Sequence, residues 1–588
     1  MVIEKRGKIA ALVLAAGYSS RMGAFKPLLP LGESTVVQEV VERFRRAGLG
    51  DVRVVVGHRA EETGAVVDRL GAGKIGNTAY DKGMYSSVLA GVKSLEPEIE
   101  AFFVLPVDIP LIKPATIASL AAAWRGSAAK VAYPRFEGLR GHPPIISTEL
   151  TADLPQDYPG GLAAFLARYD DLAVDLDVID QSILMNCNTR LDYLKLRAYR
   201  SREDIPTDRE CIALLKAQNG SQELIAHSLM VAEMARMLAV FLLPGGLALN
   251  FELVKAGGLL HDIAKGQHPD HAAAGAEFLE KIGCGRVARL VALHTDIGPG
   301  PLQPPGESEV VHFADKLVKG DRVVTLTERF EGPLKRFADR AEVLAGVKRR
   351  LRDAKTISRQ LEKILGRPPQ TIFKKYEKSM RAGLSGGKTI YLARHGAIKS
   401  PQEAKRYIGH TDLPLTAEGL RQARELAEKL RPTRLSAIFS SDLGRSFETA
   451  KIVASLHGLS PTALPGFREV ALGDWEGLSF EAVRSRYPEE YEKRGLDIVT
   501  YRPPGGESFL DCARRVLPTF YDAVYSTPGD ILIVAHAGVN RLLLCHVLGK
   551  PLSELFDIEQ DYCCLNRIGL TACSFELASL NEPLPLPD

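Results

Sequence analysis

A short apolar run at residues 9–14, followed at once by a glycine-rich loop, constrains the fold more than any other feature of the sequence. The run, IAALVL, has the length and composition of a buried strand. The adjoining segment, residues 14–32, reads LAAGYSSRMGAFKPLLPLG, and its Gly17 and Gly23 allow backbone N–H groups to approach an anion closely. Two cations in the same loop make it suitable for a nucleoside triphosphate, namely Arg21 and Lys26.

The length and composition indicate a soluble protein of several domains. A chain of 588 residues exceeds what one hydrophobic core supports, so we expect about three or four domains. Charged residues make up 25% of the chain and the net charge is only +3, which favours neither a nucleic acid nor a membrane as partner. The first apolar run is too short to cross a bilayer, no cleavage pattern follows it, and the eight cysteines are scattered. We therefore expect a cytoplasmic protein with reduced thiols.

The first third of the chain alternates between two periodicities. Strand-like runs at Val52–Val56, Phe102–Val107 and Lys130–Tyr133 are separated by helical patterns such as Thr35–Ala47 and Ala115–Trp124. This alternation predicts an α/β domain with a largely parallel sheet.

Ligands of such sheets bind beyond the carboxyl ends of the strands, so the residues that follow the apolar runs are informative. Asp108 follows one of these runs, and a carboxylate at that place could hold Mg²⁺ against a triphosphate. A lone Asp there is more often a turn residue. Ser86 in GMYSSVLAGV and His142 in RGHPPIIS are further candidates, although alone they would be a helix cap and a loop residue.

Together, the loop, the segment LPVDIPL and these two pieces resemble the nucleotidyltransferases that include the molybdenum cofactor cytidylyltransferases, with their LAAGxSxRMGxxK signature. The resemblance implies a Rossmann-like domain over residues 1–200 that transfers a nucleotidyl group to a phosphorylated acceptor and releases pyrophosphate. The LAAG form favours CTP over GTP and molybdopterin as the acceptor, with a molybdoenzyme or its chaperone as a further partner. A sugar phosphate is the alternative acceptor.

The same resemblance implies roles for individual residues. Lys26 and Arg21 would offset the charge that develops on the pyrophosphate, and Asp108 and Asn188 would hold Mg²⁺. Asn188 lies in NCNTRLDYL, where relatives commonly carry a carboxylate, and a neutral amide would hold the ion less firmly. Six residues would contact the nucleotide or the cofactor: Ala15, Ala16, Gly17, Gly23, Ser86 and His142.

The middle third is helical in pattern, and strand signals nearly vanish. Periodic apolar residues recur in ELIAHSLMVAEMARMLAVFL and in FELVKAGGLLHDIAKG. His227, the adjacent pair His261 and Asp262, and Asp315 follow one another in the order H…HD…D. This order resembles the HD phosphohydrolase family and implies an all-α domain over residues 204–380 in which the four side chains converge on a metal.

Imidazoles and carboxylates suit a divalent transition metal, which would be Mn, Fe, Ni, Co or Zn, and an open coordination position would supply the attacking water. His271 and His294 fall where two-metal members place extra histidines. The whole series most resembles the bacterial HD hydrolases that split diadenosine tetraphosphate, but a fold does not fix a substrate. The alternative is a nucleotide-regulated scaffold or sensor whose HD domain does not catalyse.

Two segments close this region. The pattern over residues 334–378 is helical and rich in Lys and Arg, and we interpret it as a solvated helix face. The segment RAGLSGGK, residues 381–388, is predicted to be a flexible linker.

The last third opens with the strand TIYLA, which leads into Arg394, His395 and a glycine. An RHG tripeptide alone arises by chance, but SSDLGRSFETA with Arg445, FREVALGDWEG with Glu469 and ILIVAHAG with His536 follow it in order. The series resembles the histidine phosphatase superfamily, which includes phosphoglycerate mutases and α-ribazole phosphatase. It implies an α/β domain over residues 388–588 with a mainly parallel sheet and a site that needs no metal.

The resemblance makes His395 the nucleophile that forms a phosphohistidine. Arg394, Arg445 and His536 would cradle the phosphoryl oxygens, and Glu469 would protonate the leaving oxygen as the general acid. The segments GHTDLPLTAEG and PPGGES resemble the small phosphatase branch, which favours a phosphatase over a mutase. All three domains would act on phosphorylated small molecules, so we predict a multifunctional enzyme.

Overall fold

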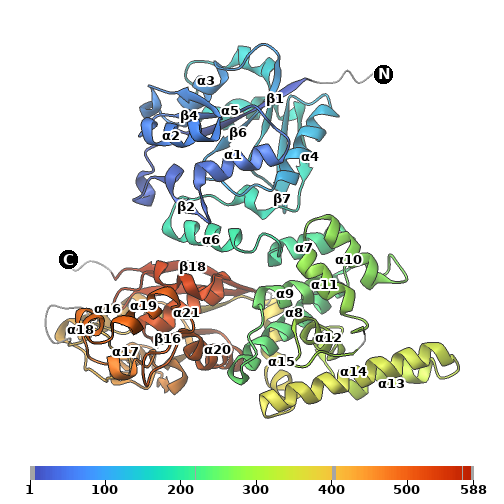
Figure 1. Cartoon of the computed structure of the whole chain (residues 1–588), viewed down its shortest axis with the longest axis vertical. Helices are drawn as coiled ribbons and strands as arrows, with labels where there is room; N and C mark the ends of the chain where they lie inside the picture. Colours follow the sequence, from blue (N-terminus) through green and yellow to red (C-terminus); the bar gives the residue numbers. More distant parts are fainter. Residues whose placement is uncertain (1–6, 219, 299, 400–405, 572–573, 585–588) are drawn as a thin grey trace. The chain divides into compact units, whose positions relative to one another are not determined.

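The computed structural model describes residues 7–218, 220–298, 300–399, 406–571 and 574–584, and the chain divides into two compact units, Met1–Glu203 and Asp204–Asp588 (Figure 1). The first unit is α/β. The second contains a helical region and a further α/β region. The structure thereby confirms the three predicted fold classes, and it places the second and third predicted domains within one unit.

The first unit is built on an eight-stranded sheet in the order β10-β7-β9-β6-β1-β4-β5, with β8 paired to β7. The central strands β6, β1, β4 and β5 run parallel, whereas β9 is antiparallel to both of its neighbours. The strands are β1 (Lys8–Ala15), β4 (Val52–Val56), β5 (Gly73–Gly76), β6 (Ile99–Pro106), β7 (Val131–Phe136), β8 (Leu139–Arg140), β9 (Ile145–Ser147) and β10 (Ala173–Asp177), and β2 (Pro30–Leu31) pairs separately with β3 (Ser34–Thr35).

Helices flank this sheet where the sequence predicted them. The strand β1 is buried along almost its whole length, as its unbroken apolar run predicts. Thr35 caps the first helix by accepting a hydrogen bond from the backbone of Gln38, and Thr189 and Asp192 form a capping box at the last one. The helices are α1 (Val36–Arg46), α2 (Ala60–Leu70), α3 (Met84–Val92), α4 (Pro114–Arg125), α5 (Gly161–Leu166) and α6 (Arg190–Arg200).

The helical region of the second unit packs around α8, which is buried over most of its length. Among the described residues, one stretch, Gln222–Gly245, is long and apolar enough to cross a membrane by length and composition, but 72% of its apolar window is buried inside the protein. The helices are α7 (Asp208–Ala217), α8 (Gln222–Leu242), α9 (Phe251–Leu260), α10 (His271–Lys281), α11 (Gly285–Leu293), α12 (Glu307–Lys316), α13 (Leu326–Arg336), α14 (Ala341–Leu365) and α15 (Pro369–Ser385), with a small hairpin of β11 (Val318–Lys319) and β12 (Arg322–Val323).

The predicted linker at residues 381–388 is wrong. Helix α15 continues to Ser385, and strand β13 begins at Lys388. The glycines at 386 and 387 end the helix, but they leave no extended spacer. The helical and α/β regions are therefore joined almost directly.

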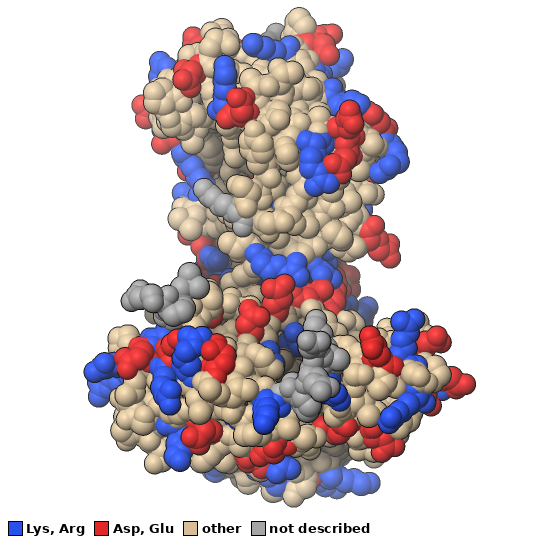
Figure 2. All heavy atoms as spheres, turned by 90° about the vertical axis from the view of Figure 1, so that its left-hand side faces the viewer, with Lys and Arg blue, Asp and Glu red and all other residues tan. Residues whose placement is uncertain are grey.

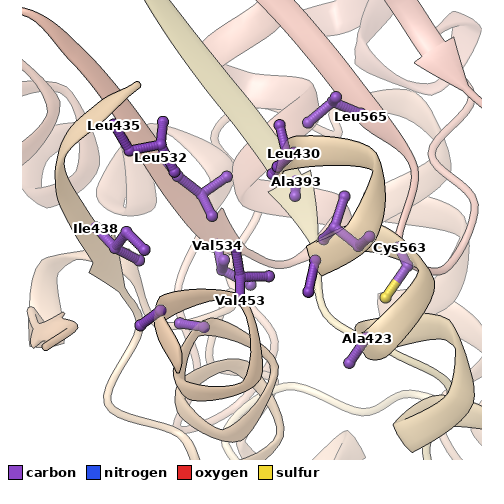
Figure 3. Close-up of a cluster of buried hydrophobic side chains, with 14 residues drawn as sticks. Ala393, Ala423, Leu430, Leu435, Ile438, Val453, Leu532, Val534, Cys563 and Leu565 are labelled. Atoms are coloured by element: carbon purple, nitrogen blue, oxygen red, sulfur yellow. The ribbon is translucent and has the colours of Figure 1, made fainter. Parts of the chain in front are cut away.

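The second α/β region has a six-stranded sheet in the order β15-β14-β16-β13-β17-β18, parallel from β15 to β13 and antiparallel at β17 and β18. Figure 3 shows its core, where Ala393, Val534 and Leu532 from the sheet meet Ala423 and Val453 from helices α16 and α17. The strands are β13 (Lys388–Arg394), β14 (Leu435–Ser440), β15 (Thr462–Ala463), β16 (Asp530–Ala535), β17 (Leu565–Thr571) and β18 (Ser574–Glu582), and the helices are α16 (Ala417–Leu430), α17 (Gly444–Ser455), α18 (Phe480–Arg486), α19 (Pro488–Leu496), α20 (Phe509–Ser526) and α21 (Ala537–Leu548).

A buried polar cluster joins the two regions of the second unit. Glu233 of α8 accepts hydrogen bonds of 2.7 and 2.6 Å from Arg236 and a third from the Tyr525 hydroxyl of α20. Lys255 of α9 pairs with Asp208, which also accepts a hydrogen bond from Ser574 of β18. Charges this deeply buried are stable only while they remain paired.

The charges on the surface are mixed. Figure 2 shows Lys and Arg side chains interspersed with Asp and Glu on the face in view, without a field of one sign. This agrees with the small net charge of +3.

We expect Glu233→Gln to destabilise the second unit by about 3 kcal/mol, because it leaves the buried guanidinium of Arg236 without its counter-charge. The matched control is Glu277→Gln, which removes a carboxylate from a surface pair with Lys281 and should leave the unfolding midpoint unchanged. Urea unfolding would be followed by Trp475 fluorescence in a Trp124→Phe background, since these are the two tryptophans of the chain. Equal midpoints for the two variants would contradict the prediction.

Candidate functional site

The loop after β1 has the conformation that its glycines predict. Gly23 has a φ of 68°, a left-handed value that favours glycine, and open space lies next to both Gly17 and Gly23. The hydroxyl of Ser19 accepts a 3.1 Å hydrogen bond from the backbone of Lys26, which folds the loop back on itself. The side chain of Arg21 lies outside the described residues. The side chains of Ala15 and Ala16 are buried, so they would meet a nucleotide only through their backbone.

Lys26, Asp108 and Asn188 meet at the carboxyl ends of β1 and β6, as the sequence predicts. The Lys26 ammonium donates to Asp108 Oδ2 at 3.0 Å and to Asn188 Oδ1 at 2.7 Å. The backbone N–H of Asn188 donates a hydrogen bond of 3.1 Å to the Asp192 carboxylate, and this bond fixes the position of Asn188. Asp108 and Asn188 thus each direct an oxygen atom at the same ammonium group. Oxygen atoms of this kind are the ligands that Mg²⁺ prefers, so the two residues fit this ion.

Ser86 and His142 lie further along the same sheet edge. Ser86 Oγ donates to the carbonyl of Gly83 at 2.8 Å and accepts from Asn77 Nδ2 at 2.9 Å, so this hydroxyl is held by its own helix start. His142 is largely buried, and its Nδ1 has no hydrogen-bond partner. Burial lowers the pKa of His142, although the charge of Asp108 opposes the effect.

An aromatic group beside the loop was not predicted. The rings of Tyr18, His58 and Tyr80 lie 5.0 to 6.3 Å apart, and Phe25 lies 5.8 Å from His58. Tyr18 is 53% exposed, so one face of the group is accessible. These residues come from three separate segments of the chain, and no local sequence pattern connects them.

A cavity of about 580 Å³ opens next to the same strand ends. Leu14 and His142 are part of its wall, which is otherwise mainly apolar. Arg140 at its wall is neutralised by Asp170 and Asp175. The cavity is large enough for a small organic molecule.

The helical region brings together all six residues predicted to bind metal. Asp262 lies at the centre, with one carboxylate oxygen 3.3 Å from His261 Nε2 and 3.9 Å from His227 Nε2. Its other oxygen is 3.2 Å from His271 Nε2 and 3.5 Å from His294 Nε2. Asp315 Oδ1 completes the first group at 3.4 Å from His227 Nε2.

This donor set fits metal ions. The ligand atoms form two groups that share Asp262, one with His227 and His261 and the other with His271 and His294. The Nε2 atoms of His227 and His261 are buried without a hydrogen-bond partner, which is costly unless an ion binds there. Burial alone would raise the pKa of Asp262, but the surrounding imidazoles hold it far below its usual value.

A buried lysine in the helical site was not singled out from the sequence. Lys316 Nζ donates to Asp315 Oδ2 at 2.6 Å and to the carbonyl of His294 at 3.0 Å. It therefore orients one residue of each metal group. Its position directly after Asp315 is the sequence feature that could have marked Lys316 as part of the site.

The third site lies at the carboxyl ends of β13 and β16. The rings of His395 and His536 lie 5.1 Å apart, and both are buried. His395 Nδ1 is 2.8 Å from the carbonyl of Gly396, and because a carbonyl only accepts, Nδ1 carries the proton and Nε2 holds the free lone pair. Neither ring nitrogen of His536 has a hydrogen-bond partner.

Cations and one carboxylate surround these histidines. Arg445 is held by the carbonyls of Thr411 and Gly409 at 2.8 and 2.7 Å. Glu469 accepts a 2.9 Å hydrogen bond from the N–H of Gly538 at the start of α21. A Cβ at position 538 would lie 2.5 Å from the Glu469 carboxylate and would displace it from this place. The five residues predicted for this site therefore lie close together in space, namely Arg394, His395, Arg445, Glu469 and His536.

Comparison with known proteins identifies the region that holds this site. Residues 390–583 match the model of the histidine phosphatase superfamily, branch 1. The adenosylcobalamin/α-ribazole phosphatase of Salmonella typhimurium is 30% identical over 33% of this chain and 96% of its own length. The chain belongs to the histidine phosphatase superfamily.

Further proteins are similar to this region. A probable phosphoglycerate mutase GpmB of Yersinia pestis is 32% identical over 30% of this chain and 83% of its own length. A solved structure, a putative α-ribazole-5′-P phosphatase from Escherichia coli, is 28% identical over 34% of this chain and 97% of that chain, with a TM-score of 0.31.

Two further family models match other parts of the chain. Residues 11–172 match a MobA-like NTP transferase domain, and residues 224–320 match an HD domain. The predicted fusion of three families is therefore confirmed. The HD match includes all six predicted metal residues, whereas Asn188 lies beyond the end of the transferase match.

The phosphatase site generates a pH prediction. Burial, with the charges of Arg394 and Arg445, holds the pKa of His395 well below its usual value of 6.5. A lowered pKa means that the nucleophile remains neutral when the pH falls to 6. We expect the amount of phosphoenzyme trapped by quenching in alkaline detergent, which preserves phosphohistidine, to be the same after reaction at pH 7.5 and at pH 6.0, and to vanish in His395→Ala. A decline that titrates near pH 6.5 would contradict this assignment.

Proposed function

We propose that the carboxyl-terminal region hydrolyses phosphomonoesters through a phosphohistidine at His395. The observation that carries this proposal is the convergence of buried His395, His536 and Arg445 with partly buried Arg394 and Glu469. His395 Nε2 attacks phosphorus, the ester P–O bond breaks, and Glu469 gives a proton to the leaving oxygen. Water then cleaves the P–N bond and releases phosphate.

The cationic character of the pocket supports this chemistry. Arg394 and Arg445 supply guanidinium donors, and His536 stands at the start of α21, where the helix dipole favours an anion. The named relatives include phosphatases and a probable mutase. We favour the phosphatase, in keeping with the motifs of residues 409–419.

We propose that the helical region is a metal-dependent phosphohydrolase with two ions that share Asp262. His227, His261 and Asp315 would hold one ion, and His271 and His294 the other. Bound divalent transition metal ions supply an activated water and polarise a phosphoryl oxygen. Lys316 keeps Asp315 and His294 in place, and Lys265 contacts the Asp262 carboxylate.

Removal of the shared carboxylate tests the metal site. Metal analysis of the purified full chain should find about two transition-metal ions per chain, and Asp262→Asn should lose both, because each group depends on this residue. His271→Ala should lose one ion. Bound nucleotide without metal and without hydrolysis of diadenosine tetraphosphate would instead support a sensor.

We propose that the first unit transfers CMP from CTP to molybdopterin with the release of pyrophosphate, in the cytoplasm. The arrangement of Lys26, Asp108 and Asn188 supports Mg²⁺-assisted binding of a triphosphate. The exposed face of Tyr18 suits a nucleobase, because aromatic rings stack on any base. The cavity beside His142 has room for the ring system of the acceptor.

Labelled CTP, GTP and molybdopterin would test the transferase directly. We expect incorporation from CTP into molybdopterin, with pyrophosphate released in equal amount. Asp108→Asn should reduce the rate by at least about 100-fold, because Mg²⁺ loses its charged ligand, whereas Tyr18→Leu should mainly raise the KM for CTP. Asp68→Asn, which removes an exposed carboxylate of α2 that pairs with Lys74, is the control. Labelling of a sugar phosphate alone would overturn the choice of acceptor.

A further inference from the structure

A tyrosine outside the phosphatase motifs stacks on the first arginine of the site. The guanidinium carbon of Arg394 lies 3.7 Å from the centre of the Tyr562 ring, a distance typical of a close cation–π contact. The same ring lies 5.7 Å from the ring of His395. Tyr562 is partly exposed, so it lies at the rim of the buried pocket.

Few other contacts restrain this arginine. Arg394 Nη1 donates to the carbonyl of Gln560 at 2.7 Å, whereas its Nε is buried without a hydrogen-bond partner. By contrast, Arg445 is held by two carbonyls. One hydrogen bond fixes a point on a guanidinium but not its plane. The face of Tyr562 supplies the missing restraint.

The backbone holds Tyr562 firmly in this place. Cys563, the next residue, has a φ of 51°, a left-handed value that is unusual for a residue other than glycine. Its side chain is buried in the core beside Ala393, as Figure 3 shows, and its N–H donates to the carbonyl of His395 at 3.3 Å. The strained turn therefore directs Cys563 inward and places Tyr562 against the pocket.

A buried amide network fixes the other end of the segment. Gln560 Oε1 accepts hydrogen bonds of 3.0 Å from both Asn540 and Asn566, and Asn566 also donates to the carbonyl of Leu392 in β13. The carbonyl that holds Arg394 thus belongs to a residue anchored on three elements. Such rigid support is typical of groups that position a catalytic side chain.

We propose that Tyr562 is a positioning residue that fixes the plane of the Arg394 guanidinium for the phosphoryl group at His395. This proposal rests on the phosphatase function proposed above. The ring needs only its face for this purpose, so the hydroxyl is dispensable. A correctly oriented Arg394 guanidinium stabilises the phosphoryl oxygens most strongly in the transition state, where their charge distribution differs from that of the bound substrate.

The test compares Tyr562→Leu with Tyr562→Phe in the full chain, using p-nitrophenyl phosphate as substrate and vanadate as a transition-state mimic. Tyr562→Leu should lower kcat about 10-fold and weaken vanadate inhibition by a similar factor, with a smaller change in KM. Tyr562→Phe should remain within about 2-fold of the native protein, because the stacking face is retained. Phe480→Leu removes an exposed ring elsewhere in the same region and should change neither quantity.

A double-mutant cycle shows whether the ring acts through Arg394. In an Arg394→Gln background, Tyr562→Leu should weaken vanadate binding no further, whereas an undiminished 10-fold loss would overturn the proposal. Equal effects of the Phe and Leu variants would overturn it as well. If the native protein fails to hydrolyse the ester, the phosphatase function fails, and the vanadate affinities of the same variants still decide the role of Tyr562. Trp475 fluorescence would confirm that each variant is folded.

Discussion

The strand register is the constraint on which both α/β sites depend. Arg394 of β13 pairs with Ala535 of β16, so the next residues along the two parallel strands are His395 and His536. His395 and His536 are therefore adjacent because two strands end together. In the first unit, Leu14 pairs with Pro106, and the glycine-rich loop and Asp108 leave the same sheet edge. A slip of one residue would send these groups to opposite faces.

The three sites differ in the charge that they leave unbalanced. In the phosphatase site, burial lowers the pKa values of His395 and His536, and the charges of Arg394 and Arg445 lower them further. The site therefore favours an anion. The HD site instead groups two carboxylates with four imidazoles, and the Nε2 atoms of His227 and His261 are buried without a hydrogen-bond partner, a donor set that favours metal cations. In the first unit Lys26 already neutralises Asp108, so that site suits a ligand that brings both a phosphate chain and its own metal ion.

Most of the fold and of the candidate site residues could be predicted from the sequence, because these residues directly follow segments with a strong strand pattern. The apolar runs IAALVL in β1, AFFVLP in β6 and IYLA in β13 are each followed by residues of a motif. The residues that were missed act from elsewhere. Tyr562 precedes a strand rather than following one, and the rings of Tyr18, His58 and Tyr80 meet only in the folded unit. Contacts of this kind have no sequence period, so local patterns do not reveal them.

The predicted linker failed for a related reason. Its glycines indicated flexibility, but tertiary packing decided the outcome: α15 lies against the rest of the unit, and Tyr376 in it donates a hydrogen bond to Asp522 of α20. The amino-acid composition of a segment indicates only the conformation that it prefers in the absence of tertiary contacts. A packed neighbour can impose a helix on a sequence with only moderate preference for one.

The buried cluster around Glu233 gives the second unit a rigid connection between two of its sites. Helix α8 carries both Glu233 and the metal residue His227, which are about 9 Å apart along the helix axis at 1.5 Å per residue. Helix α20 carries Tyr525, which contacts Glu233, and Arg515, which donates to the carbonyl of Glu469 at 2.8 Å. Each helix thus extends from the shared cluster to one site. Because unpairing these buried charges is costly, the cluster stabilises the packing of α8 against α20.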